Sequence, residues 1–345
     1  MKKAPLRFSL FCLLIVVVLF LANKQEKLYR TQIFDKLDTV SDITILSDGD
    51  GAAILDACNQ LLTEADKRYS HTNPASDISK INAAAGTNTP VSVDEKTVWL
   101  LTKAISATEQ TDGGFDITVG AISDLWSFGT EQEQIPEQSA ITTALETTGT
   151  EHLHIDQAKN TVQSDKKGQK ITLGGIAKGA ITEELLALLK EQDVSSALIN
   201  LGGNTYALGR KAKNERWTVG IQDPNNPDLL IGSLSVENRA VITSGDYQRY
   251  FEADGVRYHH ILNPQTGMPA ASGLSSVTIV SPDATNADML STACFVLGYE
   301  KSLPILQTFN ASAIFVTKDG NVCYSAGLDG QFQHENENYR YQIIP

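Results

Sequence analysis

The sequence predicts an α+β protein in which mixed or antiparallel sheets are flanked by helices. The chain has 345 residues, 41% of them hydrophobic, so it is long and apolar enough to form a packed core. Apolar residues recur at helical spacing in separate segments such as residues 52–69. Short apolar and β-branched stretches separated by polar turns occupy residues 196–262, which is typical of an antiparallel sheet.

Charge and cysteine usage argue against two classes of protein. The chain has 41 acidic and 28 basic residues, whereas a nucleic-acid-binding protein needs Lys and Arg to displace counterions from phosphates. A nucleotide ligand is still compatible with this charge, because Mg2+ and backbone amides can bind its phosphates. The four cysteines show neither CxxC nor zinc-ligand spacing. Cys58 and Cys294 lie at helical positions among apolar residues, so we expect them in the core and not in a disulfide framework.

The N-terminal segment has the pattern of a signal peptide or a short membrane anchor. Residues 8–22 are almost all Leu, Val, Ile and Phe. They follow three basic residues, Lys2, Lys3 and Arg7, which would stay in the cytoplasm and place the remainder outside. Phe20 stands where signal cleavage needs a small residue, which favours a retained anchor. We therefore expect an anchor or signal segment and a polar stalk over residues 1–30, and a folded domain over residues 31–345.

The first third of the folded domain predicts a strand followed by two helices. Residues 34–46 contain β-branched residues among Thr and Asp, which indicates a strand. Asp50 is a suitable N-cap for the helix at residues 52–69, and Asp94 is one for a second amphipathic helix around residues 98–108.

Polar segments connect these elements to the next ones. Residues 70–82 are turn-rich and read as a surface loop. Residues 112–120 place two glycines and a carboxylate after a helix, which suits either a backbone pocket for a flat ligand or an ordinary C-cap and turn. An exposed connector is expected at residues 130–139, which are rich in Gln and Glu. A helix and a hairpin are expected within residues 141–173.

Residues 171–190 predict a strand, a Gly174-Gly175 step and a helix with one apolar face. The exposed amides and the positive dipole end at such a helix start suit a phosphate group. The Walker spacing with its Lys-Ser/Thr pair and the GxGxxG fingerprint are both missing from this segment. Lys178 lies in the first helical turn, where the dipole disfavours a cation. It therefore indicates an anionic partner or a solvated side chain.

The second half of the sequence combines strands with one chemically distinctive group. Paired histidines end a strand-like stretch, and a Pro-Gln-Thr-Gly turn follows at residues 264–267. After a further strand, a helix over residues 286–298 carries Asp288 and Thr292 four residues apart, on one side of the helix. A carboxylate and a hydroxyl at this spacing can bind one divalent cation. The alternative is a solvent-facing Asp that supports the helix start.

These segments occur in the order of the motifs of a known family. The sequence resembles the ApbE family, the FAD:protein FMN transferases, over nearly all of the chain after about residue 34. The blocks are DGGFDITVGAISDLW, ITLGGIAKG, ALINLGGNTYALG, TSGDYQRYF, HHILNPQTG and ADMLSTACFVLG. The segment FDKLDTV is similar to the family's opening strand, although Leu37-Asp38-Thr39 stands where the family often has Met-Gly-Thr.

The resemblance implies two interleaved lobes around an FAD cleft and a Mg2+-dependent reaction. In that reaction FMN moves from FAD to a Thr hydroxyl of a redox protein outside the cytoplasm, and AMP is released. The metal would bridge the diphosphate, and a histidine would take the Thr proton. Together with the N-terminal segment, this predicts a membrane-tethered enzyme that faces outward, with FAD, Mg2+ and an acceptor protein as its partners.

The resemblance also assigns roles to particular residues. His260, and not its neighbour His259, falls where the family has its base. The implied metal ligands are Asp288, Thr292 and the backbone carbonyl of Gly175. The implied flavin-nucleotide contacts are Leu37, Thr72, Gly114, Phe115, Asp116, Thr172, Lys178, Leu262 and Ser291. A buried structural His260 is the alternative for the base.

Two other functions fit the same residues. In an FAD pyrophosphatase, water replaces the Thr hydroxyl and the products are free FMN and AMP. In a non-enzymatic surface flavin-binding protein, the cleft only holds FAD. Storage needs neither a base nor a metal, so the pair of groups argues against the second alternative.

Overall fold

The computed structural model describes residues 26–37 and 39–345. The predicted anchor or signal segment at residues 8–22 lies outside these ranges. Within them, no helix has the length and apolar character needed to cross a membrane. The stalk prediction is wrong from Lys27 onward, because strand β1 (Lys27–Lys36) begins there and pairs antiparallel with β2 (Thr39–Ser47). The single strand expected at residues 34–46 therefore covers the end of β1 and most of β2.

The centre of the molecule is a nine-stranded sheet with the order β1-β2-β6-β7-β10-β13-β14-β15-β17. The other strands are β6 (Ser196–Leu201), β7 (Asn204–Leu208), β10 (Arg239–Gly245), β13 (Leu274–Ser281), β14 (Ser312–Thr317), β15 (Asn321–Ser325) and β17 (Arg340–Ile344). All neighbours are antiparallel except β15 and β17. Every residue of β13 is buried, because both faces of the sheet are covered.

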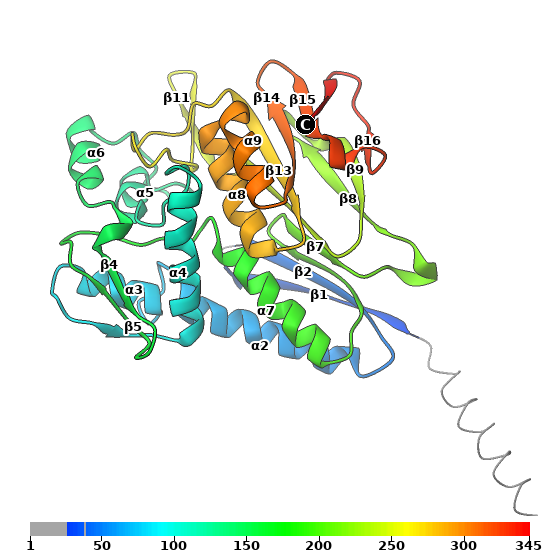
Figure 1. The fold of residues 1–345 in the computed structure, drawn as a ribbon, viewed down its shortest axis with the longest axis horizontal. Coiled ribbons are helices and arrows are strands. Elements are labelled where there is room, and N and C mark those ends of the chain that lie inside the picture. The colour runs from blue at the N-terminus through cyan, green and yellow to red at the C-terminus, as the bar shows by residue number, and fades with distance from the viewer. Residues whose placement is uncertain (1–25, 38) are drawn as a thin grey trace, which may run out of the picture.

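Helices cover one face of this sheet, and a smaller sheet covers the other (Figure 1). The helical layer consists of α2 (Gly51–Tyr69), α7 (Ala177–Glu191), α8 (Ala284–Leu297) and α9 (Tyr299–Thr308). The smaller sheet consists of β8 (Trp217–Asp223), β9 (Asn226–Val236) and β16 (Phe332–His334). Trp217, Ile231 and Phe332 of that sheet share an apolar cluster with Val241 and Ile314 of the large one.

A second lobe lies beside the large sheet, at the left of Figure 1. It contains α3 (Asp77–Ala84), α4 (Glu95–Gln110), α5 (Gly120–Trp126), α6 (Gln138–Leu145), and the small sheet of β3 (Val91–Ser92), β5 (Thr161–Ser164) and β4 (Leu153–Asp156). The chain returns to this lobe in the hairpin of β11 (Tyr250–Ala253) and β12 (Val256–His259), where Phe251 and Tyr258 pack on Trp126. The lobes are thus interleaved along the chain, and the predicted α+β class with mixed or antiparallel sheets is confirmed.

The helix starts that were predicted from an N-cap side chain are confirmed. Asp50 accepts a hydrogen bond from Ala53 N and begins α2, and Asp94 accepts one from Lys96 N and begins α4, as predicted. The loop expected at residues 70–82 is wrong in its second half, because α3 begins there.

The strand expected at residues 171–173 does not form. Ile171 N donates to Asn82 Oδ1 at 2.7 Å, and Thr172 N donates to Ile117 O at 2.8 Å. These two acceptors belong to different segments of the second lobe, so the backbone here is satisfied without joining a sheet.

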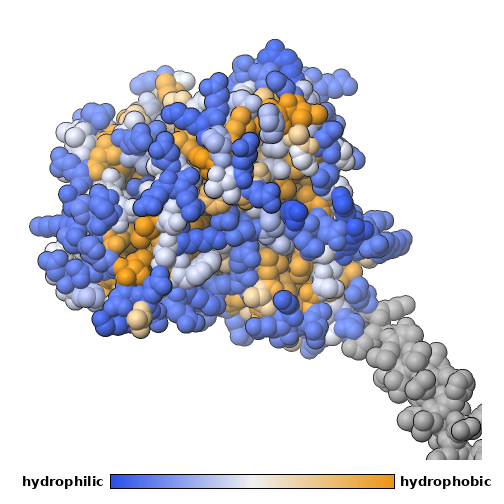
Figure 2. Space-filling model, viewed as in Figure 1, coloured by the Kyte–Doolittle hydropathy of each residue, from blue (hydrophilic) through white to orange (hydrophobic). Residues whose placement is uncertain are grey.

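The core and surface agree with the composition. Cys58 and Cys294 are fully buried, as predicted. Figure 2 shows a mainly hydrophilic face with smaller hydrophobic areas between the hydrophilic ones. The packed core expected from the hydrophobic fraction is therefore present.

Helices α7 and α8 touch closely at Gly179. A Cβ at this position would lie 2.3 Å from the Ala284 carbonyl oxygen and 2.8 Å from Asp288 Cβ. We expect Gly179→Ala to lower the free energy of unfolding by about 1–3 kcal/mol, the usual cost of overpacking, when measured by urea denaturation. Gly49→Ala is the control, because a Cβ at Gly49 would meet only Ser47 Oγ, at 3.5 Å, and should change stability by less than about 0.5 kcal/mol. Equal stability of the two variants would contradict this packing.

Candidate active site

A cleft of about 490 Å³ lies where the two lobes meet. Segments from both lobes line it, including the end of α2, the start of α7, one side of α8 and the loop after β12. It brings together most of the residues predicted for the site. These are Leu37, Gly114, Phe115, Asp116, Thr172, Gly175, Lys178, His260, Leu262, Asp288 and Thr292.

Two predicted contacts, Thr72 and Ser291, are not in the lining. Thr72 is exposed at the rim, and its hydroxyl lies 3.2 Å from the hydroxyl of Ser70, which does line the cleft. Ser291 is fully buried one layer behind, with its Oγ 2.7 Å from Ser244 Oγ and 2.8 Å from Asp288 O. Ser291 therefore lies behind the cleft lining and contacts Ser244, which is part of that lining.

The carboxylate of Asp288 is held from two other elements. It is only 3% exposed, so the solvent-facing alternative is wrong. Its Oδ2 accepts from Gly179 N of α7 at 2.9 Å, and its Oδ1 accepts from Asn204 Nδ2 of β7 at 2.7 Å. Two hydrogen bonds offset part of the desolvation cost of the buried charge. Each oxygen keeps a further lone pair for another ligand.

Thr292 and Gly175 lie next to each other at the same wall. A Cβ on Gly175 would stand 2.9 Å from Thr292 Oγ1 and 3.1 Å from the Phe115 ring. The glycine therefore leaves a small cradle beside the hydroxyl, one helical turn from Asp288, that a side chain would fill.

The donors around this cradle fit Mg2+. They are a carboxylate, a hydroxyl and backbone oxygen, all hard oxygen ligands, and Mg2+ in proteins often takes one carboxylate while waters and substrate phosphates complete its coordination. Over the described part of the chain, no group of three or more His, Cys, Asp or Glu side chains is placed to hold a metal ion. The single carboxylate beside this cradle would suit a site in which waters and substrate phosphates complete the coordination of the ion.

His260 stands at the end of the β11–β12 hairpin. Its Nδ1 is 3.2 Å from the Arg249 carbonyl oxygen, which can only accept, so Nδ1 carries the hydrogen and Nε2 keeps a lone pair. Burial, reinforced by the charge of Arg249 and to a smaller extent by His259 and Lys178, lowers the pKa of His260 to about 3. The imidazole is therefore neutral at physiological pH and able to accept a proton.

His259 has a different environment. It is 3% exposed, its Nε2 lies 3.1 Å from the Ala270 carbonyl oxygen, and its ring meets Phe295 edge-on. Burial lowers the pKa of this histidine as well. Only His260 of the pair lines the cleft, and its role as the base stays a prediction.

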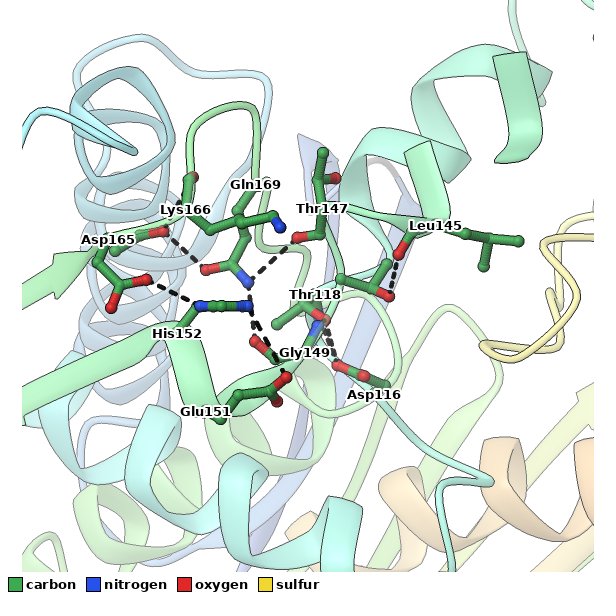
Figure 3. Close-up of polar contacts among 12 residues, drawn as sticks. Asp116, Thr118, Leu145, Thr147, Gly149, Glu151, His152, Asp165, Lys166 and Gln169 are labelled. Carbon is green, nitrogen blue, oxygen red and sulfur yellow. Dashed lines mark hydrogen bonds and ion pairs between the residues drawn. The ribbon is translucent and has the colours of Figure 1, made fainter. Parts of the chain in front are cut away.

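Asp116 is positioned by a network that sequence analysis missed (Figure 3). Its Oδ1 accepts from Thr118 N and Thr118 Oγ1, both at 2.7 Å, and Thr118 Oγ1 in turn accepts from Gly149 N at 2.8 Å. Gln169 Nε2 donates to Gly149 O at 2.8 Å. Burial raises the pKa of Asp116, the Thr118 hydrogen bonds oppose that rise, and the charge of Glu151 adds to it.

The polar groups that sequence analysis missed include Asn204, which lines the cleft, and Thr118, which lies behind it. Asn204 and Thr118 are both nearly or fully buried at strand-like or turn positions. The one available signal was a polar side chain next to a motif glycine or carboxylate, as in Gly203-Asn204 and Asp116-Ile117-Thr118. That signal does not reveal the partner, which lies more than thirty residues away in both cases.

A cleft that holds a neutral imidazole together with a buried carboxylate and a hydroxyl is an enzyme site in which a hydroxyl or water can be activated by loss of its proton. The chain belongs to the ApbE family, whose model matches residues 37–315.

Relatives of known structure or curated name agree with this membership. A protein of Treponema pallidum (strain Nichols) named FAD:protein FMN transferase is 39% identical over 294 residues, covering 80% of this chain and 80% of the relative. A protein of Klebsiella pneumoniae (strain 342) with the same name is 35% identical, and the match covers 81% of this chain and 87% of the relative. The ApbE protein of Thermotoga maritima is 35% identical in sequence. Its crystal structure matches with a TM-score of 0.82, and the match covers 90% of this chain and 100% of that chain. The apo Pseudomonas stutzeri flavinyl transferase ApbE is 28% identical, with a TM-score of 0.79 and coverage of 90% and 99%.

The lowered pKa of His260 makes stability depend on pH in a defined direction. An unfolded histidine has a pKa near 6.5, whereas folded His260 has a pKa of about 3, so the unfolded chain takes up the extra proton first as the pH falls. This group leaves stability unchanged above about pH 6.5 and lowers it progressively toward pH 3. We expect His260→Gln to lose less free energy of unfolding than the parent between about pH 7.5 and pH 5, measured by urea denaturation. Equal losses would contradict the lowered pKa.

Proposed function

We propose that this chain uses Mg2+ to transfer FMN from FAD to a threonine hydroxyl of a redox protein outside the cytoplasm, releasing AMP. Its class follows from the family: the chain is an enzyme of the FAD:protein FMN transferase type, the name its curated relatives carry. The observation that supports the finer reaction is that neutral His260 shares one cleft with Asp288, Thr292 and Gly175.

The proposed reaction forms one bond and breaks one bond. The threonine oxygen forms a bond to the phosphorus of the FMN half of FAD, the bond from that phosphorus to the bridging oxygen breaks, and AMP leaves with that oxygen. His260 Nε2 receives the threonine proton. Mg2+ held by Asp288, Thr292 and the Gly175 carbonyl would neutralise charge on the diphosphate as the bond breaks.

Charge around the base suits an anionic substrate. Arg249 and Lys178 both line the cleft and both lower the pKa of His260. A bound diphosphate would offset these cations and favour the imidazolium. The base would then be neutral before substrate binds and better able to keep the proton during transfer.

The rest of the cleft fits the flavin nucleotide. Gly114 lines the cleft with its backbone. It has no room for a side chain, because a Cβ at this position would lie 2.6 Å from the Leu297 side chain. Phe115 offers an aromatic surface beside it, and Asp116 is held rigidly by Thr118. We assign these residues, with Leu37, Thr172, Lys178 and Leu262, to FAD binding.

The location of the enzyme is part of the proposal. The basic residues before the apolar segment at residues 8–22 support a membrane-tethered chain whose catalytic part lies outside the cytoplasm. Chemical sequencing of the mature N-terminus tests the tether, since a terminus near Lys24 would replace the retained anchor by a cleaved signal.

The reaction is tested by mixing the chain from about residue 25 onward with FAD, Mg2+ and a flavin-free redox protein that carries FMN on threonine in its mature form. We expect covalent flavin fluorescence on the acceptor together with AMP, and loss of both without Mg2+. His260→Ala should bind FAD as the parent does but transfer it about 10²- to 10⁴-fold more slowly, because the general base is gone. AMP and free FMN with no labelled acceptor would favour the pyrophosphatase, and intact bound FAD would favour a carrier.

The metal site is tested by Asp288→Asn. This change removes the charge, while the Asn204 amide can rotate to stay hydrogen-bonded, so we expect the Mg2+ concentration for half-maximal transfer to rise at least about tenfold. Glu183→Gln is the matched control. Glu183 Oε1 accepts from Ala284 N at 2.6 Å beside the same helix but outside the cleft, so its Mg2+ requirement should equal the parent's. A shared change in both variants would contradict the assignment of Asp288.

A further inference from the structure

The β11–β12 hairpin is a two-stranded ribbon that projects from the body of the molecule (Figure 1). Its register pairs Tyr250 with His259 and Ala253 with Val256. Asp254 and Gly255 join the strands with φ of 51° and 75°, the geometry of a two-residue type I′ turn. Among the described residues, β12 is the only strand that pairs with β11.

The ladder shows which backbone groups of β11 point outward. His260 N donates to Arg249 O at 3.0 Å, so residues 249 and 260 form a hydrogen-bonded pair. Hydrogen-bonded and non-hydrogen-bonded pairs alternate in an antiparallel ladder. Tyr250 and Glu252 therefore belong to the non-hydrogen-bonded pairs, and their N–H and C=O groups point away from β12.

The outer edge of β11 is open to solvent. Tyr250 is 39% exposed, and Glu252 is exposed as well. Neither residue takes part in the backbone hydrogen bonds that the described loops and turns make. The outer edge of β12 is partly closed, because Arg257 is exposed there but His259 is buried and its ring reaches the Ala270 carbonyl. The edge of β11 is therefore the one at which both outward-facing residues are open to another strand.

This open edge leads directly to the proposed base. Arg249 precedes β11, lines the cleft, and has its carbonyl oxygen 3.2 Å from His260 Nδ1. The imidazole thus reaches across from the β12 side to the backbone at the start of β11. A peptide chain lying along β11 would pass the end of the ribbon that carries His260. This is where the threonine would have to give up its proton.

One face of the ribbon packs on the second lobe. Phe251 and Tyr258 stack at a ring-centroid distance of 5.4 Å, and both pack on Trp126. Arg257 lies over the Tyr250 ring, 4.2 Å from its centroid, on the opposite face. This support holds the edge in place, so a docking strand would meet a preformed partner.

We propose that the outer edge of β11 binds an extended, threonine-containing segment of the acceptor protein as a third strand. Unpaired N–H and C=O groups at strand spacing are complementary to the main chain of another strand, whatever its side chains. The inference rests on the proposed function, since it names the partner of the same active site. It assigns acceptor recognition to the backbone of Tyr250 and Glu252, apart from the groups that bind FAD.

Glu252→Pro tests the edge in steady-state transfer assays with the flavin-free redox protein described above. Proline removes the outward N–H at residue 252 and adds a ring there without removing a bond to β12. We expect KM for the acceptor to rise about tenfold, from the lost hydrogen bond and the steric block, while kcat and the Kd for FAD stay close to the parent values.

Glu252→Ala is the matched control. It removes the same carboxylate and its contact with Arg257 but keeps the backbone N–H. Its KM for the acceptor should equal that of the parent chain. An unchanged KM in Glu252→Pro, or an equal rise in both variants, would overturn the backbone docking.

Hydrogen exchange on the parent chain gives a second test that needs no variant. The amides of residues 250 and 252 should exchange more slowly when the acceptor protein is added, whereas FAD alone should not slow them. Unchanged exchange at these amides would overturn the docking whether or not transfer occurs. If the edge is protected but no flavin is transferred, the proposed function fails and the docking stands.

Discussion

The buried carboxylate of Asp288 is the constraint on which the rest of the site depends. A charge that is 3% exposed must find partners inside the protein. It finds them on α7, through Gly179 N, and on β7, through Asn204 Nδ2. Three separate elements, α7, β7 and the more distant α8, therefore meet at one carboxylate, and the proposed metal site cannot be moved without moving the helical layer against the sheet.

This meeting explains why glycines surround the site. Gly179 lets α7 approach α8 until its amide reaches Asp288, and Gly175 leaves the space beside Thr292 open. From the sequence alone, the Gly174-Gly175 step suggests a phosphate-binding helix start. The structure adds a packing requirement, since a side chain at position 175 would contact Thr292 and Phe115 before any ligand arrived.

The hairpin packed on the second lobe brings the proposed base into the cleft that also holds the proposed metal ligands. The β11–β12 hairpin carries His260 at its base and its open edge at the side, and an aromatic cluster of Trp126, Phe128, Phe251 and Tyr258 anchors it. One ribbon therefore links the proposed base to the proposed docking edge for the acceptor protein. Because burial and nearby cations keep the imidazole neutral, the same packing that fixes the hairpin also determines the state of the base.

Elements with local signals, and a set of site residues most of which line the cleft, could be predicted from the sequence alone. Caps such as Asp50 and Asp94, helical spacing and motif order depend on neighbouring residues, so α2, α4, the ApbE family and the grouping of His260 with Asp288 could all be predicted. Tertiary structure alone decided the pairing of β1 from Lys27, the non-strand path of residues 171–173, and the supporting roles of Asn204 and Thr118. It also separated His259 from His260 and placed Ser291 behind the wall. Each of these depends on a partner distant in the chain, and local propensity contains no information about such a partner.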